Sequence, residues 1–267
     1  MPLAYAISAM VYFYSLMEYT LKKSLGQHFL KDEQVCQRIF NEIEQHKCTR
    51  LLEVGPGGGA LTKYLLKLPD VDFKAVELDT EKVSYLHKNY PVLTDKILNE
   101  DFLSMQPPFQ NEFMVAGNFP YNISTQILFK MLDWKQQVPV MVGMFQKEVA
   151  QRAASPEGSK VYGVLSVLIQ AFFKVEYLFD VLPESFTPPP KVVSGVIRLT
   201  RRNDVPEMKS ERAFFVLVKT AFNQRRKTMR NAVKSLFDEE LLKDDFFQKR
   251  AEVVSVETFA ALTFKMR

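Results

Sequence analysis

The stretch Leu51-Leu52-Glu53-Val54-Gly55-Pro56-Gly57-Gly58-Gly59 decides the fold. An apolar run leads into a glycine-rich turn, and residues 60–66 that follow have the composition of a helix. Glycine has no Cβ, so a turn of this kind lets the backbone approach a ligand closely. A strand, a glycine-rich turn and a helix in this order are typical of nucleotide-binding α/β proteins.

Two acidic residues further along the chain also follow apolar runs. Glu77 comes directly after 73–76, about 20 residues beyond the glycine turn, where an acid can bind a ribose hydroxyl pair. Asp101 follows 97–100 and can accept a hydrogen bond from an adenine amino group, although a turn or helix cap is the alternative. These positions fit a dinucleotide or an S-adenosylmethionine site. The glycine pattern, E-x-G-x-G-G-G instead of G-x-G-x-x-G, favours S-adenosylmethionine.

The stretch Asn118-Phe119-Pro120-Tyr121 follows the apolar run 113–117. The amide oxygen of Asn118 and the carbonyl of Pro120 can each accept a hydrogen bond from an exocyclic amine, and Tyr121 can stack on a ring. Asn and Pro also favour ordinary turns. With the glycine turn upstream, the sequence favours a site for a flat, amino-bearing base.

Apolar strands and helices alternate along most of the chain. The expected strands are 50–55, 72–77, 95–98, 112–117, 138–145, 175–181 and 192–200, and the expected helices are 32–45, 59–67, 80–89, 122–132, 146–153 and 162–172. This alternation predicts an α/β fold with a mostly parallel sheet. The polar stretch 201–210 reads as a linker to a helical end. We therefore expect an N-terminal extension (1–20), a sheet domain (21–200) and a small all-α domain (201–267).

Composition limits the possible functions. The net charge is only +4, so total charge does not indicate a nucleic-acid partner. Cys36 and Cys48 lack metal-ligand spacing, and with three scattered histidines we expect reduced thiols, a cytoplasmic protein and no metal centre. Residues 2–17 are apolar and contain no basic residue, which fits neither a signal peptide nor a membrane span. Three explanations stay open: translation from an upstream start, a small added segment, or an extra helix packed on the core.

Basic residues are concentrated near the C-terminal end. Between Lys219 and Leu236 there are six basic residues and no acidic one. Arg226, Arg230 and Lys234 are spaced by four, which on a helix gives one basic stripe, and Met229, Val233, Leu236 and Phe237 would form its apolar face. A solvated helix face is the alternative to phosphate binding.

Five motifs in order resemble the ribosomal RNA adenine N6-dimethyltransferases, over roughly residues 21–267. They are Lys22 to Leu30 (KKSLGQHFL), Glu53 to Gly57 (EVGPG), Asn118 to Tyr121 (NFPY), Phe186 to Val192 (FTPPPKV) and Ala221 to Lys227 (AFNQRRK). Two positions depart from the family: Phe119 stands where leucine is common, and His28 where asparagine is common. The second change matters only if the side chain, not the backbone, contacts the donor.

The resemblance implies a Rossmann-like class I methyltransferase sheet with one antiparallel strand near its end. It implies that S-adenosylmethionine is the methyl donor and that the substrate is a pair of adjacent adenosines near the 3' end of small-subunit ribosomal RNA, within a pre-30S particle. It also implies that the enzyme acts as a monomer. The implied donor-binding residues are His28, Leu30, Gly55, Glu77, Asp101 and Asn118. The implied catalytic residues are Asn118, Pro120, Tyr121 and Phe186, of which Phe186 would stack on the base. The RNA-binding residues are Arg225, Arg226, Lys227, Arg230 and Lys234. A methyltransferase acting on large-subunit RNA, a non-catalytic nucleic-acid-binding factor and, more distantly, a nicotinamide oxidoreductase are the alternatives.

Overall fold

The structure, a computed structural model, describes residues 28–47, 49–224 and 226–267. The expected N-terminal extension, 1–20, lies outside the described residues, and so does Arg225.

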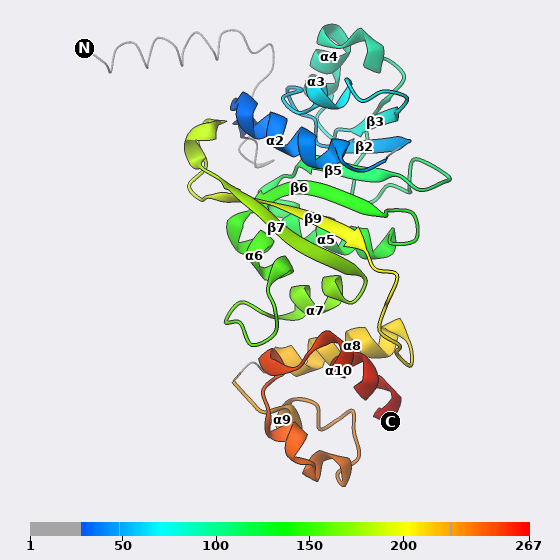
Figure 1. Ribbon diagram of the computed structural model, residues 1–267, viewed down its shortest axis with the longest axis vertical. Coiled ribbons are helices and arrows are strands. Elements are labelled where there is room, and N and C mark those ends of the chain that lie inside the picture. Colours follow the sequence, from blue (N-terminus) through cyan, green and yellow to red (C-terminus); the bar gives the residue numbers. More distant parts are fainter. Residues whose placement is uncertain (1–27, 48, 225) are drawn as a thin grey trace, which may run out of the picture.

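A seven-stranded sheet forms the centre of the molecule, in the order β4-β3-β2-β5-β6-β9-β7 (Figure 1). Its strands are β2 (Arg50–Val54), β3 (Asp72–Val76), β4 (Ile97–Leu98), β5 (Met114–Asn118), β6 (Val140–Gln146), β7 (Phe173–Val181) and β9 (Ser194–Arg201). The pairs among β4, β3, β2, β5 and β6 are parallel, whereas β9 runs antiparallel to both β6 and β7. This confirms the expected mostly parallel sheet with one reversed strand. Strand β2 lies between β3 and β5, so the strand order reverses there, and ligands bind at such a point in open α/β sheets.

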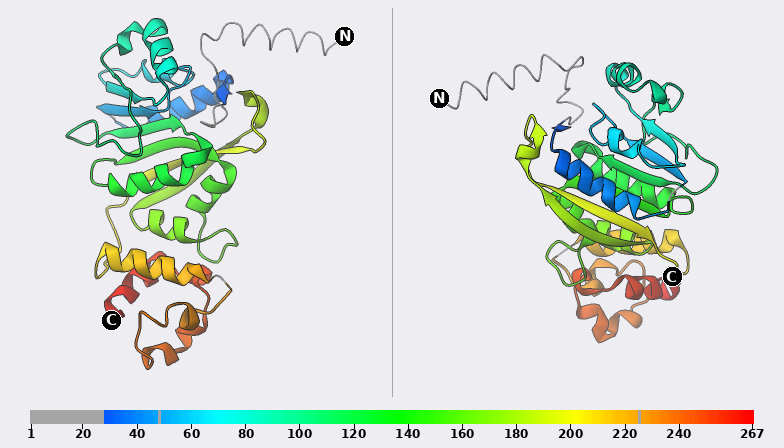
Figure 2. Two further views of the ribbon diagram at one scale, coloured as in Figure 1. Left: turned by 180° about the vertical axis from the view of Figure 1, so that it is seen from behind. Right: turned by 45° about the horizontal axis from the view of Figure 1, so that its top comes forward.

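Helices cover both faces of the sheet (Figure 2). They are α2 (Glu33–Glu44), α3 (Thr62–Leu65), α4 (Thr80–Asn89), α5 (Ser124–Asp133), α6 (Lys147–Ala154) and α7 (Val164–Gln170). Leu51 packs in the cluster that contains the apolar face of α2, whereas Leu52 and Val54 pack in the cluster that contains α5 and α7. Because both faces are covered there, the central strands β5 and β6 are buried along almost their whole length instead of alternating.

Two aspartates define where helices on the sheet begin. The Asp32 carboxylate accepts from the backbone N–H groups of Gln34 and Val35 at the start of α2. The Asp79 carboxylate accepts from Glu81 N at the start of α4. Side-chain caps of this kind satisfy backbone donors that the first helical turn leaves free. The second cap fixes the chain just after the end of β3.

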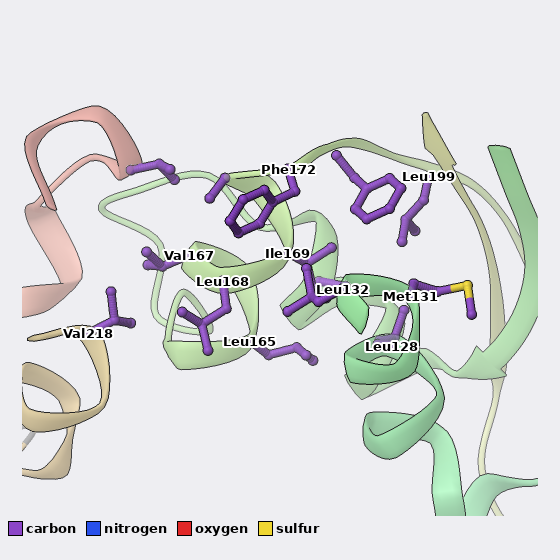
Figure 3. Close-up of a cluster of buried hydrophobic side chains, with 14 of the residues drawn as sticks. Leu128, Met131, Leu132, Leu165, Val167, Leu168, Ile169, Phe172, Leu199 and Val218 are labelled. Atoms are coloured by element: carbon purple, nitrogen blue, oxygen red, sulfur yellow. The ribbon is translucent and has the colours of Figure 1, made fainter. Parts of the chain in front are cut away.

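Helix α7 joins the sheet to the C-terminal helices (Figure 3). Its residues Leu165 to Ile169 are all buried, and a helix that is buried all round belongs in a core. Figure 3 shows Ile169 beside Leu132 of α5, with Val167 and Leu168 on the side of Val218. Val218 belongs to α8 (Glu211–Asn223), whose buried residues Phe214, Leu217, Val218 and Ala221 are those that the sequence placed on one face.

The described part of the chain after Arg201 contains helices and no strand. It comprises α8, α9 (Met229–Ala232), α10 (Val256–Leu262) and the 3-10 turns η5 (Leu241–Lys243), η6 (Asp245–Gln248), η7 (Ala251–Val253) and η8 (Thr263–Lys265). One hydrophobic cluster holds residues from the sheet and from these helices together, from Leu52 of β2 to Phe259 of α10. The helical end therefore shares a continuous core with the sheet.

Several predicted elements are shorter in the structure. The expected helix 59–67 is regular only in α3, and the expected strand 95–98 only in β4. The expected helix carrying the basic stripe is wrong, because α9 spans only four residues. A short second sheet was not predicted: β1 (Phe29–Leu30) pairs antiparallel with β8 (Phe186–Thr187). Among the described residues, no helix has the length and apolar composition that a membrane crossing needs.

Candidate active site

A cavity of about 260 Å³ lies at the carboxyl edge of the sheet, beside the point where the strand order reverses. Its walls come from the ends of β2, β3 and β5 and from the chain before α2. Eight residues that the sequence predicted for the site line it: His28, Leu30, Gly55, Glu77, Asp101, Asn118, Pro120 and Tyr121. Parallel strands end at one edge, so residues far apart in the sequence meet there.

The glycine turn holds the Glu77 carboxylate in a fixed position. Gly55 and Gly57 have φ values of 70° and 57°, a region that L side chains rarely adopt. In this conformation Gly57 N donates to Glu77 Oε2 at 3.1 Å, and Asp79 N donates to Oε1 at 3.0 Å. Glu77 is only 7% exposed, but each carboxylate oxygen has a further lone pair. A preorganised acceptor pair of this kind suits two neighbouring hydroxyl groups.

Glu53 is a second acid in the cavity wall, and it was not among the site residues predicted from the sequence. It is 2% exposed and accepts a hydrogen bond from Thr62 Oγ1 at 2.7 Å. Burial is the main cause that raises the pKa of Glu53 to about 8; the Thr62 hydrogen bond opposes the rise and the nearby Glu77 charge adds to it. An acid inside the apolar strand Leu51 to Val54 was the signal available in the sequence.

Lys82 is a third ionisable group in the wall. It lies in the first turn of α4 and is only 5% exposed. Its Nζ is 3.8 Å from the place where a Cβ on Gly57 would be, so the cation lies beside the glycine turn. Its spacing from the motifs gave no reason to select it from the sequence, because a lysine in a helix usually faces solvent.

The position of Asp101 is compatible with both roles considered for it. Its Oδ1 accepts from Leu103 N at 2.9 Å, which is the turn contact. The residue is exposed and lines the cavity at the same time. The carboxylate can therefore accept from a ligand while the turn holds it.

The two proposed amine acceptors have different surroundings. Asn118 is the last residue of β5, and its side-chain amide makes no hydrogen bond within the described part of the chain. The Pro120 carbonyl accepts from Ile123 N at 3.3 Å and from Ser124 Oγ at 3.4 Å, both long contacts. The Asn118 amide is thus free to take a ligand donor, whereas Pro120 has weak internal donors to exchange.

Phe119, the residue between these two acceptors, fixes their position by burying its ring in the core. Its side chain is 1% exposed and lies 4.7 Å from Phe145, centroid to centroid. Gly117 and Gly143, which are paired across β5 and β6, make room for it: a Cβ on either would lie within 3.0 Å of the ring. The larger ring at a position where the family often has leucine is thus accommodated by two glycines.

Tyr121 is held at its hydroxyl and flanked on its ring. The hydroxyl lies 2.5 Å from Ser194 Oγ, and burial raises the pKa of Tyr121 while the Ser194 contact lowers it. The His28 ring is stacked near it, at 5.8 Å between centroids and 29° between planes. His28 Nδ1 also lies 2.8 Å from the Pro188 carbonyl oxygen. The His28 ring is therefore engaged with the protein itself.

The prediction that Phe186 stacks on a base is wrong for this structure. Its side chain is 1% exposed and packs in the hydrophobic cluster of α2, and it is absent from the cavity wall. The reason is the β1–β8 pair, in which Phe186 lies opposite Leu30 and is directed into the core.

The basic residues near the C-terminal end do not form a helical stripe. Arg226 and Lys234 are exposed but lie outside α9. Arg230 is half-buried, and its guanidinium donates to the Leu242 carbonyl at 2.6 Å and to the Lys243 carbonyl at 3.1 Å. Arg230 therefore braces the turn η5, whereas Lys227 is exposed like Arg226 and Lys234.

Comparison with known proteins agrees with this site. Residues 18–262 match the family described as "Ribosomal RNA adenine dimethylase". The chain belongs to the ribosomal RNA adenine dimethylase family. A relative from Flavobacterium johnsoniae, named "Ribosomal RNA small subunit methyltransferase A", is 51% identical over 249 residues, which cover 92% of this chain and 95% of the relative. One of the same name from Bacteroides thetaiotaomicron is 52% identical, covering 91% and 92%.

Solved structures show that the dimethylase fold extends over most of the chain. A dimethyladenosine transferase from Plasmodium falciparum superposes with a TM-score of 0.74 at 23% identity, covering 87% of this chain and 94% of that one. The 23S rRNA methyltransferase ErmE superposes with a TM-score of 0.68 at 23% identity, covering 89% and 99%. At this identity the likeness shows the shared class I methyltransferase fold. It does not distinguish between the two RNA substrates.

Proposed function

We propose that the protein transfers methyl groups from S-adenosylmethionine to the N6 amines of two adjacent adenosines near the 3' end of small-subunit ribosomal RNA, giving N6,N6-dimethyladenosine. The observation that carries this proposal is the placement of Asn118 and Pro120 at the cavity that contains the glycine turn and Glu77. The names of the relatives, small-subunit methyltransferases about half identical to this chain, support the choice of RNA.

The residues present fit the donor. S-adenosylmethionine supplies a methyl group bound to a sulfonium, and the neutral thioether that departs is a good leaving group. Glu77 would accept hydrogen bonds from the ribose hydroxyls, and Asp101 from the adenine amine. The buried carboxylate of Glu77 suits a ligand that carries positive charge. Leu30 adds an apolar wall.

The protein's main task is to prepare a poor nucleophile. The lone pair of an adenine N6 is delocalised into the ring. When the Asn118 amide oxygen and the Pro120 carbonyl accept both N6 hydrogens, they favour a more tetrahedral nitrogen with a localised lone pair. Methylation makes the departing proton acidic, so a strong general base is not required. Positioning and preorganised acceptors then account for the chemistry.

The second methyl transfer requires one acceptor to release its hydrogen. After the first transfer N6 has a single hydrogen, and only one acceptor can keep it. The Pro120 carbonyl has Ile123 N–H and the Ser124 hydroxyl as alternative donors, whereas Asn118 has none among the described residues. Release by Pro120 leaves no buried acceptor unpaired, so Asn118 keeps the last hydrogen.

The target base must leave its stack so that its N6 amine can enter the cavity, which costs a few kcal/mol. Tyr121 would stack on the extruded base, on the side of its ring not flanked by His28. Base–aromatic stacking contributes about 1–3 kcal/mol, enough to offset much of that cost.

The surface that would hold the RNA includes the exposed Arg226, Lys227 and Lys234. Three lysine and arginine side chains close together in sequence, without an acidic neighbour, suit phosphate groups. We propose that the substrate is ribosomal RNA within an assembling pre-30S particle. The protein would act on it as a monomer in the cytoplasm, where ribosomes assemble.

The test is mass-spectrometric mapping of methylated adenosines after incubation with labelled donor. Unmethylated small subunits, fully methylated small subunits and large subunits are offered separately. Label in dimethyladenosine of unmethylated small subunits alone is expected. Label in the large subunit would indicate the other RNA, and label in neither would refute the proposal.

Replacing Asn118 by alanine tests the chemistry. Loss of one preorganised acceptor should cost about 2.7–4 kcal/mol of barrier, a fall of about 10²–10³ in the single-turnover rate, with donor affinity changed far less. Asn41, which is exposed on α2 and absent from the cavity wall, is the matched control for an asparagine-to-alanine change. An Asn118→Ala variant with a wild-type rate would remove Asn118 from the mechanism.

A further inference from the structure

The Ser194 hydroxyl is placed where it can fix the ring of Tyr121. Ser194 is the first residue of β9 and is 0% exposed. Because β9 is antiparallel to β6, it begins at the edge where β6 ends, and Ser194 lies opposite Gln146, the last residue of β6. An antiparallel strand thus brings its first residue to the carboxyl edge of a parallel sheet, which is the edge that carries the site.

The backbone around Ser194 is rigidly held on both sides. Ser194 pairs with Gln146 of β6 and with Val181 of β7. The residue before it, Val193, accepts a hydrogen bond from Lys147 N at 3.0 Å. The sheet therefore fixes the backbone that carries the Ser194 hydroxyl, and only rotation of the side chain remains.

Tyr121, in contrast, belongs to no strand. It begins the three-residue 3-10 turn η3 (Tyr121–Ile123), which has no side-chain cap. Its ring is fixed by two contacts: the hydroxyl at 2.5 Å from Ser194 Oγ, and the neighbouring His28 ring. The hydroxyl contact is the shorter and more directional of the two, so it determines how far the ring can swing about its Cα.

We propose that Ser194 is a positioning residue for methyl transfer, which sets the Tyr121 ring in the orientation that receives the target base. The inference rests on the proposed function, in which Tyr121 stacks on that base. Ser194 itself is absent from the cavity wall, so it acts through Tyr121 and not on the substrate.

A double-mutant cycle tests this, with single-turnover methyl transfer to unmethylated small subunits at saturating donor. Ser194→Ala is expected to lower the rate about tenfold, the effect of losing one hydrogen bond. Tyr121→Phe, which keeps the ring but loses the hydroxyl, should lower it by a similar factor. Combining the two should cost no more than Tyr121→Phe alone, because the contact is already lost. The donor dissociation constant should stay at the wild-type value in all three.

Ser166→Ala is the control for loss of a buried serine hydroxyl. Ser166 is also 0% exposed, and its hydroxyl accepts from Gly163 N and donates to the Arg152 carbonyl, away from the cavity wall. It should lower the melting temperature without changing the transfer rate. If Ser194→Ala lowers the rate equally in the wild-type and Tyr121→Phe backgrounds, Ser194 acts through general packing and the proposal is wrong. A Ser194→Ala variant with a wild-type rate would overturn it as well.

A second readout is independent of the substrate. The ring signals of Tyr121 in tyrosine-labelled protein, followed by NMR without RNA, should shift or broaden in Ser194→Ala and remain in place in Ser166→Ala. Unmoved Tyr121 signals in Ser194→Ala would overturn the inference even if the protein methylates a different RNA. Failure of the wild-type protein to methylate small subunits would count against the proposed function instead.

Discussion

Replacing Gly143 by alanine should disturb the active site through Phe119, because the three atoms nearest to the added methyl group all belong to Phe119. Gly143 lies in β6, opposite Gly117 of β5 and Ile197 of β9. A Cβ added there would be 1.9 Å from Phe119 Cε2, 2.7 Å from Cδ2 and 3.0 Å from Cζ. Carbon atoms in contact lie about 3.5–4.0 Å apart, so the ring or the strand must move by roughly 1.6 Å or more.

The ring has little space in which to move. Gly117 and Phe145 pack against its other parts, and the residue is 1% exposed. Overpacking of this kind costs about 1–3 kcal/mol, and each kcal/mol lowers the melting temperature by about 2–4 °C in a chain of roughly this size. Asn118 and Pro120 are the chain neighbours of Phe119, so the shift also moves both amine acceptors. A misplacement of about 1 Å can reduce a rate about 100-fold.

The assay is single-turnover methyl transfer at saturating donor, together with thermal unfolding. We expect Gly143→Ala to lose about 100-fold in rate, with a much smaller change in donor affinity. Adding Phe119→Leu should recover part of both losses, because leucine lacks the ring that meets the new methyl group. Gly163→Ala is the control, since a Cβ there would meet nothing closer than 4.0 Å. A Gly143→Ala enzyme with wild-type rate and melting temperature, or a double variant worse than Gly143→Ala, would refute the reasoning.

Three further predictions concern individual side chains. Glu77→Gln should raise the donor dissociation constant at least about tenfold by calorimetry, because charge-assisted hydrogen bonds contribute about 1.5–3 kcal/mol and an amide can accept only one of the two N–H groups that the carboxylate accepts. Burial raises the pKa of Glu53 from 4.5 to about 8, so the folded protein keeps a proton that the unfolded chain releases; the donor-free wild type should lose free energy of unfolding relative to Glu53→Gln as pH rises from 4.5 to 8, and a flat difference across that range would contradict the raised pKa. Arg230→Gln should lower the melting temperature and leave the salt dependence of RNA binding unchanged, whereas Lys234→Gln should reduce the slope of log affinity against log salt by about 0.7–0.9; the opposite assignment in filter-binding titrations would show that Arg230 is the phosphate contact.

Much of the site followed from the sequence because strand ends in a parallel sheet meet at one edge. Apolar runs fixed where β2, β3 and β5 end, and the residues at those ends, Gly55, Glu77 and Asn118, had to lie together there. The glycine turn was likewise readable, because Gly55 and Gly57 adopt φ values that other residues avoid.

The tertiary structure decided the residues that act across long separations in the chain. The pairing of β1 with β8 buries Phe186, although the motif suggested an exposed ring. The reversed strand β9 brings Ser194 to Tyr121, and the pairing of Gly117 with Gly143 makes room for Phe119. Local patterns cannot show these contacts, since each depends on strand register.

The spacing of Arg226, Arg230 and Lys234 shows the limit of periodicity most clearly. A repeat of four residues is compatible with a helix but does not require one, and a helix of four residues such as α9 gains little from its own hydrogen bonds. Helix α9 contacts α8 and the turn η6, and the carbonyls of Leu242 and Lys243 in η5 accept hydrogen bonds from the Arg230 guanidinium. Sequence alone determined that the region is basic; the tertiary structure determined which of its charges the fold itself engages, because a half-buried cation needs a partner within the protein.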